Sequence, residues 1–293
     1  MASEGDRRPD LEVEARRSRL LDGLRLEAEG ARGVAIALVS TAVFVAAVLV
    51  AVTQSPGWPE VHRVFFDWHD ISSSFPEIAR AFVLNVKVFS VCEVFILVLA
   101  LLIAVLRSLP GPVFFPLRAL AIIYADLARG VPTILVIALL GYGAPALQLT
   151  GVPRSRVFWA GVGLVLVYSG YVAEVYRAGI ESVHPSQEAA ARSLGLSRFQ
   201  ALRRVILPQA IRRVIPPLLN DFIGLQKDTA LVGTLGVVEA FNQSQIDSSA
   251  TFTFGSYLAA AALFVALTIP LARLTDWLVA RDRRRRQAAG VVA

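Results

Sequence analysis

Ionisable side chains lie inside long apolar segments of this chain, where each is costly unless it pairs or faces water. Lys227 and Asp228 are neighbours within one such segment. Together they could hold the carboxylate and the ammonium group of a zwitterion that has lost its water. The alternative is an internal ion pair that only joins two helices. Both interpretations predict a polar surface enclosed by several apolar helices.

Two other pairs of opposite charge are spaced three residues apart, so each pair would share one face of a helix. Asp126 and Arg129 precede a glycine and a proline, which predicts either a broken span that lines a transport pathway or a proline kink held by an ion pair. Glu174 and Arg177 end another apolar segment and predict a gate or a structural pair. Lys87 either lines the same cavity or extends its amine outward. The other candidates for the pathway are Asn85, Glu93, Asn220 and Asp221.

The elements that carry these groups are helices long enough to cross a membrane. Hydrophobic residues make up 55% of the chain, its mean hydropathy is +0.59, and residues 34–52 contain no charge. A run of that length matches a hydrocarbon core of about 30 Å. Because acidic residues precede it and it exceeds the apolar core of a signal peptide, we interpret this run as a retained anchor. The predicted spans are 34–53, 81–106, 117–147, 157–176, 214–238 and 256–280.

This pattern predicts an all-α, polytopic membrane protein with six transmembrane helices, in which one extra N-terminal helix precedes a five-helix core. Lys and Arg concentrate in the loops on the side of the two tails, which predicts that both termini are cytoplasmic. The predicted parts are a cytoplasmic tail (1–33), the extra helix (34–53), an extracytoplasmic loop (54–79), a core (80–280) with a prominent loop at 184–208, and a basic tail (281–293).

The net charge of +6 comes from arginines that flank the apolar segments, where they would contact membrane lipid. Nucleic acid is not an expected partner, because the aromatic residues lie in the apolar segments and not between the arginines. The single cysteine, Cys92, excludes an intrachain disulfide and is interpreted as a small core residue. No residue cluster predicts a metal or a cofactor. No G-x-x-x-x-G-K-[ST] loop is present, so any ATP would be hydrolysed by a partner and the chain is not expected to be an enzyme.

The polar segment 184–208 between the fourth and fifth spans predicts two short helices joined at a glycine. Pro185 suits a helix start, and Gly195 supplies a left-handed stop. Ser197 and Gln200 have the spacing of a capping box, and Pro208 is expected to end the second helix. Such a bent element could dock into a groove on a soluble partner. It could also lie on the membrane surface, with its arginines on anionic lipid.

This segment resembles the EAA loop of binding-protein-dependent ATP-binding-cassette permeases, in which E-A-A and a later glycine precede an I-x-L-P motif. Aligning that glycine with Gly195 puts Ala189 in the place of the motif glutamate. The nearest acid is Glu188, which lies about 100° around the helix. The resemblance implies that the residues coupling to an ATPase are Gln187, Glu188, Ala190, Ala191, Gly195, Leu207 and Pro208.

Segments 124–143, 169–183 and 220–237 also resemble stretches of the polar amino-acid permeases of this family, and the resemblance covers residues 80–280. It implies alternating access driven by cytosolic ATPase subunits in the cytoplasmic membrane of a prokaryote. It also implies a second permease, as a copy or a paralogue, and an extracytoplasmic binding protein that delivers an amino acid. Two alternatives stay open: a secondary transporter driven by an ion gradient, and a membrane scaffold that transports nothing.

Overall fold

A computed structural model describes residues 32–109 and 111–288, and every regular element within these ranges is a helix. It divides into two compact units, Met1–Arg63 and Val64–Ala293. In the first unit, the described helix Arg32–Thr53 is apolar and long enough to cross a membrane, and none of its most hydrophobic stretch is buried. This helix corresponds to the extra span predicted at 34–53. The short helix α2 (Trp58–Phe65) follows it.

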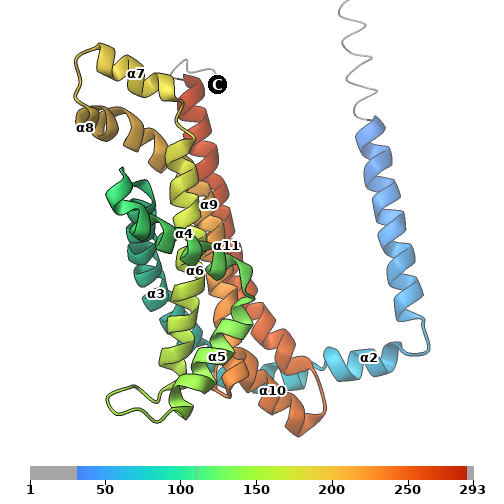
Figure 1. Ribbon diagram of the computed structural model, residues 1–293. Helices are drawn as coiled ribbons and strands as arrows, with labels where there is room; N and C mark the ends of the chain where they lie inside the picture. Colours follow the sequence, from blue (N-terminus) through green and yellow to red (C-terminus); the bar gives the residue numbers. More distant parts are fainter. Residues whose placement is uncertain (1–31, 110, 289–293) are drawn as a thin grey trace, which may run out of the picture. The chain divides into compact units, whose positions relative to one another are not determined.

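The second unit is built around α6 (Arg156–Glu181), which packs against helices from both halves of the unit. The helices α7 and α8 lie at one end of the unit, and α5 and α10 lie at the other (Figure 1). The elements of this unit are α3 (Trp68–Ser108), η1 (Pro112–Phe114), α4 (Phe115–Gly130), α5 (Thr133–Ala146), α6, α7 (Pro185–Ser193), α8 (Arg198–Ala201), η2 (Leu202–Ile206), α9 (Leu207–Asp228), η3 (Thr229–Leu235), α10 (Ala240–Thr251) and α11 (Gly255–Ala288).

Four helices of the described residues are long and apolar enough to span a membrane, and the bent pair α4 and α5 raises the number to five. The remaining predicted span corresponds to α9, which carries Asn220, Asp221, Lys227 and Asp228 along its length. A helix of this composition is costly in lipid unless it is packed against protein. The contacts agree with that expectation, because α9 packs against α3, α6 and α11.

The helix α3 begins much earlier than the predicted second span. It starts at Trp68, inside the range 54–79 that was predicted as a loop, and it contains Pro76. The start is set by Asp67, whose carboxylate accepts hydrogen bonds from the backbone N–H groups of His69 and Asp70 at 2.8 and 3.4 Å. This is the usual arrangement of an N-cap. Local capping therefore extends the helix beyond its hydrophobic part.

The predicted third span is two helices, α4 and α5, bent by 101° at their junction. Val131 and Pro132 between them have extended backbones, with ψ of 131° at both residues. A proline disfavours the helical conformation of the residue before it, so the break falls where the sequence predicts it. Of the two interpretations of this region, a broken span describes the backbone better than a simple kink.

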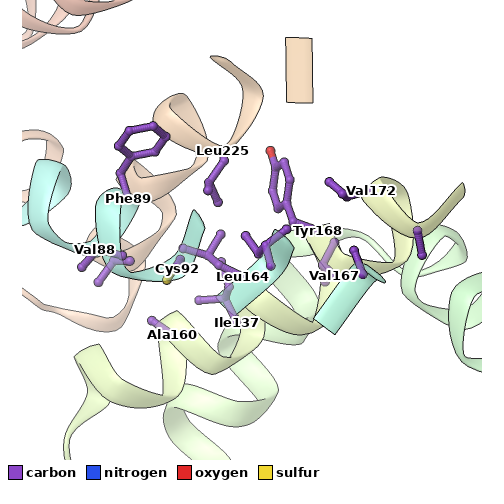
Figure 2. Packing of buried hydrophobic residues seen from close by; sticks show 14 of the residues in the cluster. Val88, Phe89, Cys92, Ile137, Ala160, Leu164, Val167, Tyr168, Val172 and Leu225 are labelled. Atoms are coloured by element: carbon purple, nitrogen blue, oxygen red, sulfur yellow. The ribbon is translucent and has the colours of Figure 1, made fainter. Parts of the chain in front are cut away.

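The core of the second unit lies where α6 meets α3, α5 and α9 (Figure 2). Small residues allow close packing here: a Cβ on Gly163 of α6 would lie 3.3 Å from the Cα of Ile137 in α5. Cys92 of α3 has an exposed fraction of only 4%, which confirms its prediction as a small core residue. The residues labelled in Figure 2 are Val88, Phe89, Cys92, Ile137, Ala160, Leu164, Val167, Tyr168, Val172 and Leu225.

Candidate coupling element and translocation pathway

The predicted bent pair is present at one end of the second unit, as α7 followed by α8 (Figure 1). Pro185 occupies the first turn of α7, and the side chain of His184 accepts a hydrogen bond from the N–H of Ser186 at 3.2 Å. At the far end of α7, Gly195 has a φ of +84°. Its N–H bonds to the carbonyl of Arg192, and the next N–H bonds to that of Ala191. These two bonds form a Schellman motif and confirm the predicted glycine stop.

The second helix of the pair starts with the predicted capping box. The hydroxyl of Ser197 accepts from the N–H of Gln200 at 3.2 Å, and the side-chain oxygen of Gln200 accepts from the N–H of Ser197 at 2.9 Å. The predicted stop at Pro208 is wrong, because α8 continues through the π-helical turn η2 into α9. Pro208 lies in the first turn of α9, where a missing N–H costs nothing.

The surface of this bent pair combines apolar and polar groups around the glycine corner. Leu194 and Phe199 flank the corner and are 84% and 68% exposed. Among the residues predicted to couple to an ATPase, Ala191 is buried against the pair itself, with an exposed fraction of 5%. Glu188 is half-buried, and the exposed members of the set are Gln187, Ala190, Gly195, Leu207 and Pro208. An exposed apolar corner on a polar hairpin is suited to dock into a groove.

The two predicted pairs, Asp126 with Arg129 and Glu174 with Arg177, form one charged cluster near the end of the unit that carries α7 and α8. Glu174 of α6 is its centre: Arg107 of α3 lies 2.9 Å away, Arg129 of α4 lies 4.0 Å away, and Arg177 pairs with it along α6. Asp126 in turn pairs with Arg129 at 2.7 Å. The carboxylate of Glu174 therefore joins three helices. Sequence analysis missed Arg107, which carries no local signal that separates it from an ordinary arginine at a helix end.

The adjacent residues Lys227 and Asp228 do not form the predicted ion pair in the part of the chain that the structure describes. Asp228 instead accepts a hydrogen bond from the hydroxyl of Tyr168 at 2.9 Å, while Lys227 is exposed. Asp221 lies two helical turns before Asp228 on α9 and is half-buried. One of its carboxylate oxygens is buried and has no hydrogen-bond partner within the described residues. Glu93 of α3 is an electrostatic neighbour of Asp221. An acidic, partly enclosed surface thus lies between α3, α6 and α9.

Asn85 lies in a buried network and does not line an open path. Its amide nitrogen donates to Glu239 at 2.8 Å and to the hydroxyl of Thr229 at 3.2 Å, and its oxygen accepts from the N–H of Ala240 at 3.2 Å. Asn85 and Glu239 are 2% and 1% exposed. Glu239 was missed by sequence analysis, although an acid directly before a helix is a possible N-cap signal. Asn220, the other predicted asparagine, is exposed.

A small polar pocket of about 240 Å³ lies between the start of α3 and the helices α10 and α11. Its lining includes the carboxylates of Asp70, Glu77 and Asp247. Burial raises the pKa of Asp247, and the nearby Glu77 carboxylate raises it further, while a hydrogen bond from Gln243 acts in the opposite direction. No group of three or more His, Cys, Asp or Glu residues within the described ranges is arranged to hold a metal ion.

Apolar spanning helices, charged groups enclosed between them and a bent helical hairpin at one end together define a polytopic membrane permease. The chain belongs to the family of binding-protein-dependent transport system inner membrane components, whose sequence profile matches residues 96–284. It is therefore a transport permease embedded in the membrane, as the sequence predicted. Nothing in this assignment favours the secondary transporter or the scaffold.

Relatives and solved structures agree with that family. The chain is 37% identical to the probable amino-acid permease protein YxeN of Bacillus subtilis (strain 168), over 72% of this chain and 93% of that protein. It is 38% identical to the probable glutamine ABC transporter permease protein GlnM of the same organism, over 63% and 83%. A crystal structure of an amino acid ABC transporter with histidines matches with a TM-score of 0.67 and 29% identity, over 73% of this chain and 98% of that chain.

Proposed function

We propose that this chain is the permease subunit of an ATP-binding-cassette importer that carries polar amino acids across the cytoplasmic membrane. The observation that carries the proposal is the hairpin of α7 and α8, with its Schellman corner at Gly195 and its exposed Leu194 and Phe199. Its shape suits a lever on which a cytosolic ATPase acts. The names of the relatives, which are permeases for amino acids and glutamine, support the substrate class.

The proposed assembly contains this permease, a second permease copy or paralogue, two cytosolic ATPase subunits and an extracytoplasmic binding protein. ATP binding would close the ATPase pair and move α7 and α8, and the cavity would then open outward to accept substrate. In this arrangement the loop 184–208 and both termini are cytoplasmic, and the start of α6 faces outward. The coupling residues keep the roles expected from the sequence, with Ala189 standing in for the motif glutamate.

The proposed pathway follows the acidic surface between α3, α6 and α9. Asp221, with its unpartnered oxygen, and Asp228, held by Tyr168, would face the ammonium group of an amino acid. Lys227 is exposed and lies one residue from Asp228, so it would face the carboxylate. A desolvated zwitterion needs both kinds of group. Asn220, exposed on the same helix, would contribute to this surface as well.

The charged cluster around Glu174 is proposed as an inner gate. It joins α3, α4 and α6 near the end that carries α7, and its ion pairs with Arg107, Arg129 and Arg177 would have to rearrange when these helices separate. Asp126 takes part through Arg129. A set of ion pairs with two discrete arrangements is a suitable element for alternating access.

The coupling role is tested by Gly195→Asp. Residues other than glycine rarely adopt a backbone φ of +84°, so this change should distort the corner. The distortion would not come from a clash, because a Cβ at Gly195 would meet no atom within 4 Å. Gly151→Asp is the matched control, because Gly151 has a φ of +81°, equally open space, and a position in the loop before α6. The measurement is ATP-dependent uptake of radiolabelled amino acids into proteoliposomes that contain the permease, its ATPase and its binding protein.

We expect Gly195→Asp to abolish uptake and to leave membrane insertion intact, and Gly151→Asp to retain uptake. Uptake at the wild-type rate by Gly195→Asp would contradict the coupling role. Uptake by the permease alone in liposomes, without an ATPase, would contradict the proposed function as a whole.

A further inference from the structure

An apolar groove runs between α3 and the first part of α6, away from the acidic surface of the proposed pathway. Its volume is about 510 Å³, and its walls include Val91 and Phe95 of α3 and Phe158 of α6. These three side chains are 58%, 60% and 48% exposed. On α6 the groove reaches from Val157 to Leu166, which is the half of that helix remote from α7. The groove therefore opens toward the membrane end opposite the hairpin of α7 and α8.

Of the described residues that line this groove, Lys87 is the single charged one. Lys87 is exposed, and within the described residues the structure records no hydrogen bond or ion pair for it. Along α3, Lys87 and Arg107 are about 30 Å apart at a rise of about 1.5 Å per residue, which equals the thickness of a hydrocarbon core. Arg107 directly follows the span predicted at 81–106, and Lys87 lies near the opposite end of that span, from which its amine can reach the boundary. The groove extends from this amine into the depth of the membrane.

We propose that this groove is a specific binding site for an anionic phospholipid of the leaflet opposite the coupling hairpin. One acyl chain would lie in the groove against Val91, Phe95 and Phe158, and the phosphate of the headgroup would pair with the amine of Lys87. Charge complementarity selects this occupant, because a cation at the membrane boundary without a protein partner attracts an anionic headgroup by about 1 kcal/mol, which is about fivefold in affinity. An uncharged apolar partner would leave Lys87 without a counter-ion.

The glycine in the wall of the groove agrees with a chain-shaped occupant. Gly161 of α6 faces Cys92 of α3, and the thiol of Cys92 donates to the carbonyl of Gly161 at 3.6 Å. A Cβ at Gly161 would lie 3.4 Å from that sulfur, so the helices approach closely at the floor. The bulky residues stand at the rim, where they can close over a flexible chain. The site thus has an apolar floor and walls and one polar end.

The test measures the phospholipid that stays bound to the full-length chain after purification in mild detergent from liposomes of equal phosphatidylglycerol and phosphatidylethanolamine. Bound lipid is extracted and quantified by mass spectrometry. We expect the wild-type chain to retain phosphatidylglycerol in preference to phosphatidylethanolamine. Lys87→Gln should lower that preference about fivefold. Arg80→Gln, a matched change of an exposed cation outside the groove on the same helix, should leave it unchanged.

A second pair of variants tests the groove separately from the charge. Val91→Trp places a bulky ring in the groove and should lower the total amount of bound lipid. Val94→Trp is its control, because Val94 is 61% exposed on the same helix and does not line the groove. Size-exclusion chromatography shows whether each variant is folded and reports its oligomeric state.

Equal lipid preference in Lys87→Gln and Arg80→Gln would overturn the proposal. It would also be overturned if Val91→Trp shifted the chain from dimer to monomer without changing bound lipid, because the groove would then be an interface between copies of the permease. Neither outcome would bear on the coupling role of Gly195, which is measured by uptake.

Discussion

The buried network around Asn85 allows a quantitative prediction for the substitution Asn85→Leu. This change removes the donors to Glu239 and Thr229 and the acceptor for the N–H of Ala240. Side-chain hydrogen bonds in membrane proteins contribute about 0.6–1.7 kcal/mol each, so three of them give a loss of about 2–5 kcal/mol in the free energy of unfolding. Glu239, 1% exposed, keeps only its two bonds from the N–H groups at the start of α10.

The assay is unfolding of the purified full-length chain in mixed micelles by SDS, followed by far-ultraviolet circular dichroism. Asn220→Leu is the matched control, since Asn220 is exposed and has no recorded side-chain hydrogen bond among the described residues. We expect it to change the free energy of unfolding by less than about 0.5 kcal/mol. If both variants unfold at the same SDS fraction, the network around Asn85 does not stabilise the fold and the reasoning is wrong.

Two further predictions concern charge. Glu174→Gln leaves three arginines without their shared carboxylate and should cost about 1–3 kcal/mol in the same SDS assay, between the values for exposed and buried pairs. Asp126→Asn, at a side chain that is 58% exposed, should cost less than about 1 kcal/mol, and an equal loss in both variants would refute a central role for Glu174. At Asp247, burial raises the pKa of the carboxyl, so its stabilising contribution is present below the unfolded pKa of about 3.9 and is lost as pH rises through the folded value. Thermal unfolding of Asp247→Asn should therefore lack this loss as pH rises above about 3.9, and a pH profile identical to that of the wild type would contradict it.

The hairpin of α7 and α8 was predictable in detail because its signals are local. A glycine stop, a capping box and a proline at a helix start each involve residues within one or two turns. The structure has all three, at Gly195, Ser197 and Pro185. The prediction failed at Pro208, because the π-helical turn before it places Pro208 in the first turn of α9, where a missing N–H is tolerated.

The polar residues of the spans show the opposite situation. The hydropathy pattern shows where these residues lie along the chain, but it does not show which of them form hydrogen bonds or ion pairs with one another. Lys227 and Asp228 are adjacent in the sequence, yet the partner of Asp228 is Tyr168 on another helix. A residue's place along a helix is readable from the sequence, whereas the face that a neighbouring helix covers depends on how several helices pack together.

Composition, apolar run length and short capping motifs were sufficient to show that this chain crosses a membrane as helices and carries a bent hairpin between two of them. Those features depend on residues close together in the chain, and their physics is local. The pairings of Arg107 with Glu174 and of Asn85 with Glu239 join residues 67 and 154 positions apart. Such contacts form only when the helices are packed, because their free energy comes from burying two distant groups side by side.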